Sequence, residues 1–322
     1  MTTEARAFWT TAPGRGEIRT EPLSDPGPDD VLVRTIYSGI SRGTESLVFQ
    51  GLVPPSEYER MRAPFQSGTF ALPIKYGYAN VGVVEAGKNG FVGQRVFSLF
   101  PHQTHFVIPA GAAHPIPEAI PPRRAVLAAN LETAINGLWD AEVQAGDRVT
   151  VIGAGVVGSL VAWLAGRIPG CHVQLVDTVR SRLSIASSLG VAFAMPENAT
   201  PERDVVVHAS GAPEGLATAL RLAAFEGIIV EMSWYGTREV TVPLGEAFHA
   251  KRLTLRSSQV GHIAPRQRAR WDNRRRMGLA LELLVDPALD VLLTGDSAFE
   301  ALPQTMAALV EPGKALCHVV RY

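Results

Sequence analysis

Cysteine is scarce in this sequence, with only Cys171 and Cys317 among 322 residues. Two cysteines exclude a framework of several disulfides and a structural zinc site built from four cysteines. An excess of charge is also absent, because the formal net charge is −1. A near-neutral chain gives no electrostatic reason to expect nucleic acid or an anionic membrane as the main partner. The first ten residues, MTTEARAFWT, lack a secretory signal pattern, so we expect a cytoplasmic protein.

The sequence is rich in apolar residues, which make up 46% of the chain and can form large hydrophobic cores. Its length exceeds that of one ordinary core and favours two domains. Residues 1–129 contain short apolar segments separated by Pro, Gly and Asp, which predicts a small antiparallel barrel or sandwich. The strands that we expect there are 31–36, 81–86, 95–99 and 105–108. Prolines at 115–122 then mark a boundary, followed by a predicted helix at 124–138.

A glycine motif dominates the middle of the chain. The apolar segment 149–152 is typical of a buried strand, and Gly153, Gly155 and Gly158 follow it as G-x-G-x-x-G. Val157 begins a helical apolar pattern, and a second apolar strand is predicted at 172–176. Val156 and Val157, within the glycine motif, are expected to contact the cofactor together with the three glycines. This order of strand, glycine turn, helix and strand predicts a βαβ unit that binds a dinucleotide, with its pyrophosphate at the start of the helix.

The residue after the second strand bears on the choice of cofactor. Asp177 lies 19 residues after Gly158, close to the spacing at which a carboxylate accepts a hydrogen bond from the ribose 2′-hydroxyl. That charge would repel a 2′-phosphate, so NAD is favoured over NADP. Arg180 and Arg182 follow closely and would suit a 2′-phosphate, so NADP stays open.

Strands and helices continue to alternate after Asp177, which predicts a parallel, doubly wound sheet. Ser210 and Gly211 follow a predicted strand at 204–209, and Ser233 follows another at 227–232. Because cofactors bind at the carboxyl ends of such strands, we expect these residues near the nicotinamide end of the cofactor. Ordinary turn residues are the alternative interpretation.

Four segments are informative, SGISRGTES at 38–46, PIKYGYANVGVVEAG at 73–87, NLETAINGL at 130–138 and VTVIGAGVVG at 149–158. Together they resemble the medium-chain dehydrogenase/reductase superfamily, the zinc-type alcohol dehydrogenases and their zinc-free relatives. The first looks most like the threonine dehydrogenase-like and bacteriochlorophyllide dehydrogenase-like branches. The resemblance implies a GroES-like catalytic domain at 1–129 and 263–322, a Rossmann domain at 130–262, and a homodimer.

The resemblance also implies that the zinc ligands are replaced. Ser41 stands where zinc-dependent members have a cysteine, and Tyr78 stands where they have a histidine. Glu132 matches a glutamate that lies near the metal in polyol-dehydrogenase-like members, and the lobe for structural zinc is missing. Catalytic zinc needs about three protein ligands, so we expect no metal site. If a zinc site were nevertheless present, Glu132 together with His102 or His105 would supply its ligands.

Without a metal, hydrogen-bond donors must polarise a carbonyl and an acid must protonate the product. Tyr78 is the first candidate for this acid, with Ser41 and Thr44 as further donors. His102 would relay a proton and Glu132 would orient it. The alternatives are a core tyrosine with a bonded hydroxyl and structural histidines.

Two more residues acquire roles by resemblance. Arg42 matches a basic contact to the pyrophosphate, and Gln259 matches the lining of the nicotinamide pocket. A surface arginine and an ordinary turn residue are the alternatives. The basic segment 266–276 is interpreted as a solvated helix face or a salt-bridged surface, and 54–70 as a substrate lid, a surface elaboration or a dimer contact.

The expected function is therefore a zinc-independent NAD(P)-dependent oxidoreductase that acts on a small molecule. It would move hydride between the nicotinamide and a carbonyl, an alcohol or an activated alkene. Two alternatives remain open: a zinc-dependent alcohol dehydrogenase with atypical ligands, and a dinucleotide-binding protein without catalysis.

Overall fold

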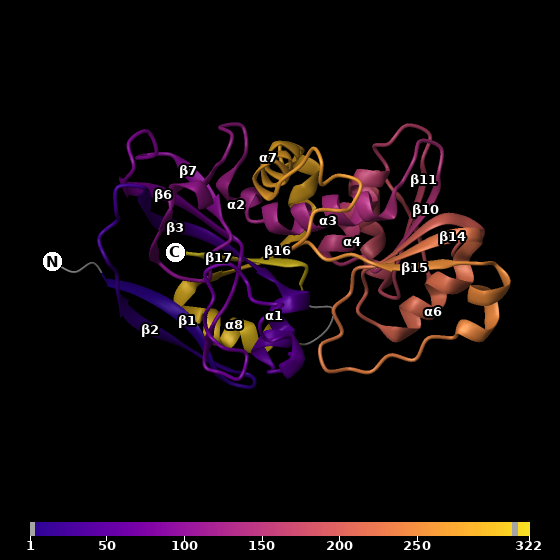
Figure 1. Cartoon of the computed structure of the whole chain (residues 1–322), viewed down its shortest axis with the longest axis horizontal. Helices are drawn as coiled ribbons and strands as arrows, with labels where there is room; N and C mark the ends of the chain where they lie inside the picture. Colours follow the sequence, from indigo (N-terminus) through magenta and orange to yellow (C-terminus); the bar gives the residue numbers. More distant parts are fainter. Residues whose placement is uncertain (1–3, 311–314) are drawn as a thin grey trace. The chain divides into compact units, whose positions relative to one another are not determined.

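The computed structural model describes residues 4–310 and 315–322. The chain forms two compact units, Met1–Ala129 with Leu281–Tyr322 and Asn130–Ala280 (Figure 1). In this division the chain re-enters the first unit at residue 281, whereas the sequence analysis predicted re-entry at residue 263. Among the described residues, no helix has the length and apolar character needed to cross a membrane.

The first unit is built mainly from antiparallel strands. β1 alternates buried and exposed positions, as expected for a strand with one face on a core. A four-stranded sheet has the order β2-β1-β5-β4, and a larger sheet has the order β16-β17-β3-β6-β7-β9, with β8 also paired to β3. The strands are β1 Glu4–Ala12, β2 Arg15–Pro22, β3 Asp30–Ser41, β4 Ser67–Gly68, β5 Ile74–Lys75, β6 Asn80–Gly87, β7 Arg95–Ser98, β8 His105–Pro109, β9 His114–Pro115, β16 Leu293–Ala298 and β17 Cys317–Arg321.

Where the structure describes this unit, its α-helices are α1 Arg42–Phe49, α2 Pro122–Ala125 and α8 Leu302–Leu309. Buried side chains of β1, α1 and α8, including Phe8, Phe49 and Met306, form one core cluster. β17 pairs antiparallel with β3, with Cys317 opposite Ser41. The end of the chain therefore lies along the strand that leads into α1.

The second unit contains a six-stranded sheet whose neighbouring strands are all parallel, in the order β12-β11-β10-β13-β14-β15. β10 and β13 are buried almost throughout, as central strands covered on both faces require. Figure 1 labels β10 and β11 on one side of this sheet and β14 and β15 on the other, and β13 lies between the two pairs. The strands are β10 Arg148–Ile152, β11 His172–Val176, β12 Ala192–Ala194, β13 Arg203–His208, β14 Ala223–Glu231 and β15 Thr254–Ser257.

Helices connect these strands, and the strand order reverses between β10 and β13. A reversal of this kind is the point at which doubly wound sheets bind ligands, at the carboxyl ends of the strands. The helices are α4 Val156–Ala165, α5 Leu183–Ser188 and α6 Pro213–Leu222, with α3 Ala128–Ala141 and α7 Asn273–Leu283 at the ends of the unit. The predicted fold class, a doubly wound parallel sheet with a β-rich domain, is confirmed.

Short helical turns complete the chain. They are η1 Pro55–Glu57, η2 Ala110–Ala112, η3 Arg180–Arg182, η4 Pro196–Asn198, η5 Leu244–Phe248, η6 Pro287–Leu292 and η7 Phe299–Ala301. The single helix predicted at 124–138 was wrong, since the structure has two helices, α2 and α3. The sequence also missed β12 and β16, which are edge strands and therefore need less apolar surface.

Candidate functional site

The glycine motif forms the turn between β10 and α4. Gly153 has φ +104°, and a Cβ there would lie 2.7 Å from the backbone of Ser210. A Cβ at Gly158 would overlap the carbonyl oxygen of Gly153, so this glycine lets α4 pack tightly against the turn. Gly155 is the N-cap residue of α4, and nothing lies within 4 Å of its would-be Cβ. The turn therefore leaves open space at the start of a helix, which fits a pyrophosphate.

Asp177 follows β11 and holds this turn. Its Oδ2 accepts a hydrogen bond of 2.7 Å from the Ala154 N–H, and its Oδ1 accepts one of 2.8 Å from the Val179 N–H. The carboxylate thus lies beside the glycine turn, where a carboxylate that binds the cofactor's ribose is expected. Arg182 lies in the next turn, η3. Val156 and Val157 are the first two residues of α4, at the edge of the same turn.

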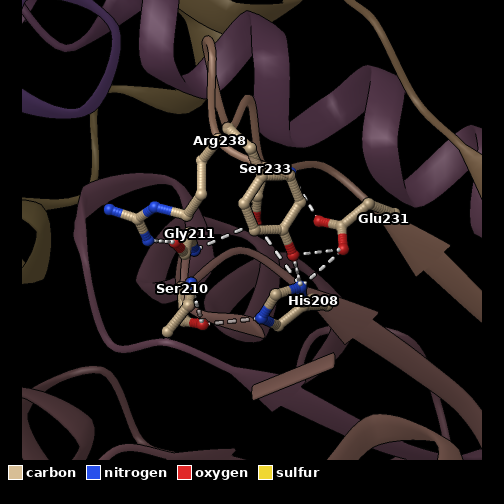
Figure 2. A network of polar contacts seen from close by, with 8 residues as sticks. His208, Ser210, Gly211, Glu231, Ser233 and Arg238 are labelled. Carbon is tan, nitrogen blue, oxygen red and sulfur yellow. Dashed lines mark hydrogen bonds and ion pairs between the residues drawn. The ribbon is translucent and has the colours of Figure 1, made fainter. Parts of the chain in front are cut away.

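A second set of residues gathers at the carboxyl ends of β13 and β14 (Figure 2). His208 is fully buried, with its Nδ1 2.7 Å from Glu231 Oε2 and its Nε2 2.6 Å from Ser210 Oγ. Ser233 donates its N–H to Glu231 Oε1 over 2.7 Å, and its Oγ accepts the Gly211 N–H over 3.0 Å. The structure therefore brings the predicted residues Ser210, Gly211 and Ser233 together.

Several charges and hydroxyls stabilise this cluster. Burial opposes ionisation of Glu231, but the hydrogen bonds from His208 and Ser233 lower the pKa of its carboxyl below the ordinary value. Tyr235 donates its O–H to Glu231 Oε2 over 3.0 Å, and burial with the nearby Glu231 charge raises the pKa of the Tyr235 phenol. Arg238 donates to the carbonyl oxygen of Gly211 over 3.3 Å.

Sequence reasoning missed His208 and Glu231. Each is the last residue of a buried parallel strand, β13 or β14, that is otherwise largely apolar. A titratable side chain at that position is a signal that the sequence did contain. It marks the sheet edge at which ligands bind.

In the first unit, the side chains of Ser41 and Thr44 interact with the phenol of Tyr78 and oppose part of the rise in its pKa. Ser41 is the N-cap residue of α1, yet its hydroxyl does not cap the helix. Its backbone N–H donates instead to Glu45 Oε1 over 2.7 Å. Burial raises the pKa of Tyr78 far above its ordinary value, and the charge of Glu45 adds to the rise. Tyr78 therefore remains protonated and can act as a donor. The hydroxyls of Tyr78, Ser41 and Thr44, which the sequence analysis grouped together, lie near one another in the structure.

His102 belongs to a buried network beside these residues. Its Nε2 lies 2.8 Å from Glu45 Oε2 and its Nδ1 lies 2.7 Å from Ser38 Oγ. The carboxylate that orients His102 is thus Glu45, and the expectation that Glu132 does so was wrong. Glu45 follows Ser41 by one helical turn, which brings its side chain back to the N-terminus of α1. Sequence reasoning overlooked it.

Glu132 has a different partner, in the second unit. Arg276 Nε donates to Glu132 Oε1 over 3.1 Å, and Arg276 Nη1 donates to Asn136 Oδ1 over 2.6 Å. Burial raises the pKa of Glu132 although Arg276 opposes the rise. Arg276 is 2% exposed, so the interpretation of 266–276 as a wholly solvated or surface segment was wrong at this residue. A buried carboxylate needs such a partner.

The remaining predicted residues lie elsewhere. Arg42 is the first residue of α1 in the first unit. Gln259 accepts the Gly261 N–H over 2.7 Å and lines a cavity of about 540 Å³ in the second unit. Arg256 and Arg268 line the same cavity, whose walls do not include Ser210 or Ser233.

The donor atoms at the zinc positions of the family do not fit zinc. Zinc in proteins is bound by cysteine, histidine and carboxylate side chains, whereas Ser41 and Tyr78 offer an alcohol and a phenol. Within 4–310 and 315–322, no group of three or more His, Cys, Asp or Glu side chains is placed to hold a metal ion.

Curated relatives of the chain are dehydrogenases. An uncharacterized zinc-type alcohol dehydrogenase-like protein of Haemophilus influenzae is 30% identical, over 39% of this chain and 40% of the relative. D-guloside 3-dehydrogenase of Escherichia coli is 27% identical, over 49% and 48%. The matches therefore span less than half of these two relatives. The 2-desacetyl-2-hydroxyethyl bacteriochlorophyllide A dehydrogenase of Rhodobacter capsulatus is 29% identical, over 70% and 71%. No family model matches the chain.

Solved structures match over nearly the whole chain. A short chain alcohol dehydrogenase of Escherichia coli in complex with NADH has a TM-score of 0.76 at 18% identity, over 99% of this chain and 100% of that one. A Sinorhizobium meliloti dehydrogenase bound to NADP has a TM-score of 0.79 at 19% identity, with the same coverage. The predicted resemblance is confirmed: the chain is similar in sequence to zinc-type alcohol dehydrogenase-like proteins, and its fold is similar to that of the solved dehydrogenases.

Proposed function

We propose that the chain is an NAD(P)-dependent oxidoreductase that works without zinc. The observation that carries the proposal is the glycine turn, open at Gly155 and flanked by the carboxylate of Asp177. The names of the relatives support it, since they describe dehydrogenases. The bound cofactor would supply or accept the hydride, and the protein would bind and orient both reactants. The other reactant would be a small molecule with a carbonyl, an alcohol or an activated double bond.

NAD is the cofactor that this site favours. A carboxylate at Asp177 suits the two ribose hydroxyls of NAD and repels the additional phosphate of NADP. Similar folds hold either cofactor, since one neighbour was solved with NADH and another with NADP. The preference for NAD thus depends on this chain's own residue.

The acid in this proposal is Tyr78. Its raised pKa keeps the proton on the phenol, and the side chains of Ser41 and Thr44 are close enough to influence that pKa. Such a donor both polarises a carbonyl oxygen and delivers a proton to it. A cytoplasmic homodimer completes the proposal on the strength of the family resemblance, and light scattering tests the dimer.

The experiment compares Tyr78→Phe with Tyr76→Phe. Tyr76 is a buried tyrosine whose ring lies 5.9 Å from that of Tyr78, so its variant removes a hydroxyl at a neighbouring position. With NADH and a panel of carbonyls and enones, we expect turnover by the parent chain. Tyr78→Phe should lower that rate by about 100-fold or more, with NADH affinity unchanged.

Equal rates in Tyr78→Phe and the parent chain would remove Tyr78 from the mechanism. NADH binding with no turnover across the whole panel would favour a dinucleotide-binding protein without catalysis.

A further inference from the structure

Ser210, His208 and Glu231 form a connected series of a hydroxyl, an imidazole and a carboxylate (Figure 2). The two links measure 2.6 Å and 2.7 Å, and they use opposite nitrogens of the His208 ring. This is the arrangement in which an imidazole takes a proton from a serine while a carboxylate holds the ring and stabilises the imidazolium. The cofactor-binding role expected of Ser210 does not require this series of hydrogen bonds.

The surroundings keep the three groups in place. Glu231 accepts hydrogen bonds from the Ser233 N–H and from the Tyr235 hydroxyl, so both of its oxygens are fixed. A Cβ at Gly215 would overlap Ser210 Oγ and would lie 2.5 Å from His208 Nε2. Glycine at 215 therefore leaves the room that the serine–histidine contact needs.

Ser210 is also accessible, because it is exposed whereas His208 is fully buried. The Ala212 N–H donates to its Oγ over 3.2 Å, and α6 begins at the next residue. The N-terminus of a helix favours negative charge nearby, including charge that develops on an oxygen during a reaction. An electrophile can thus approach a serine that already has a base and a favourable field.

We propose that Ser210 is a nucleophilic serine, with His208 as its base, that attacks the carbonyl carbon of small activated esters. In this step the Ser210 Oγ–carbon bond forms, and the proton passes to His208 Nε2. The ester carbon–oxygen bond then breaks, the proton leaves with the alcohol, and water hydrolyses the acyl-serine in the same way. Glu231 is a positioning residue that holds the imidazole and balances its charge.

Serine–histidine contacts elsewhere in the described residues serve as internal comparisons. Ser38, His102 and Glu45 repeat the same three groups at 2.7 Å and 2.8 Å, but Ser38 is 0% exposed. Ser297 Oγ lies 2.9 Å from His318 Nε2, and among the described residues no carboxylate forms a hydrogen bond with His318. The first set lacks access and the second lacks the carboxylate, so neither should react.

The experiment treats the full chain with p-nitrophenyl acetate, without added cofactor. Nitrophenolate release is followed, and the acid-quenched protein is mapped by mass spectrometry. We expect an acetyl group on Ser210 and none on Ser38. Ser210→Ala should lose the adduct, and release should slow by about 100-fold. Ser297→Ala is the matched control and should behave as the parent chain does.

Glu231→Gln keeps the size of the side chain and removes its charge. It should slow acetylation of Ser210, whereas a merely structural role would leave the rate unchanged in a variant with an unchanged melting temperature. Absence of acetyl from Ser210 in folded protein, or equal release by Ser210→Ala, would overturn the proposal.

A further measurement, acetylation of Ser210 in the presence of NADH, rests on the proposed function. Because the backbone of Ser210 lies against Gly153, bound NADH should slow acetylation. Acetylation that persists in saturating NADH would count against the proposed cofactor site, and it would still support the nucleophilic serine. The two proposals therefore fail through different outcomes.

Discussion

Glu45 and His102 are 2% and 1% exposed and lie 2.8 Å apart, which makes them a fully buried pair. Glu45 also accepts the Ser41 N–H, so this carboxylate links the histidine to the start of α1. Removal of one partner from such a pair leaves the other polar groups buried and unpaired, which is costly. At the scale of single residues, we therefore expect this pair to matter for stability as well as for the position of Ser41.

Glu45→Leu tests this expectation by replacing the carboxylate with an apolar side chain of similar size. The free energy of unfolding should fall by about 3 kcal/mol or more, measured by urea denaturation. Glu85→Leu is the control, because Glu85 pairs with Arg34 at an exposed site and its loss should cost about 1 kcal/mol or less. Similar losses in both variants would contradict the account of Glu45.

Asp177→Asn tests the preference for NAD. The amide removes the charge that repels a 2′-phosphate, so the affinity for NADPH relative to NADH should rise by about tenfold. Fluorescence titration with both cofactors measures the ratio. Asp147→Asn is a suitable control, since Asp147 also accepts a backbone N–H, from Gln144. An unchanged ratio in Asp177→Asn would remove this residue as the determinant.

Among the elements, the glycine turn contains one glycine that we expect to matter for cofactor binding and another that we expect to matter for folding. Gly155 has open space around its would-be Cβ, whereas a Cβ at Gly158 would overlap the backbone of Gly153. Gly155→Ala should therefore weaken NADH binding by about tenfold or more and leave the melting temperature unchanged. Gly158→Ala should lower the melting temperature, because α4 must move away from the turn.

Calorimetry of the two variants, with and without NADH, checks this difference. Gly278→Ala is the control, since nothing lies within 4 Å of its would-be Cβ either and it is far from the motif in sequence. If Gly155→Ala bound NADH as tightly as the parent chain, the open space there would not be a pyrophosphate site.

The sequence predicted elements best where apolar pattern and turn residues agree. β11 has the predicted bounds, and β10 and α4 lie on either side of the glycine motif as expected. Strands β12 and β16 could not be found in this way, because edge strands of three and six residues carry little apolar pattern. The break between α2 and α3 was missed because 124–138 shows no proline or glycine at that point.

At the scale of the whole molecule, the sequence predicted the two-part fold and the class of relatives. Partners of buried polar groups were harder to predict, because they depend on contacts between distant segments. Glu132 with Arg276 and Glu45 with His102 are separated by 144 and 57 positions. The family resemblance brought Ser41, Thr44 and Tyr78 to attention, but it could not show which carboxylate reaches which histidine.

We propose that this chain binds a nicotinamide cofactor without help from a metal. The first experiment is a titration of the metal-stripped protein with NADH, followed by nicotinamide fluorescence, with zinc added at the end. We predict micromolar binding that zinc does not change. Binding of NADH only after zinc is restored, or no binding at all, would contradict this proposal.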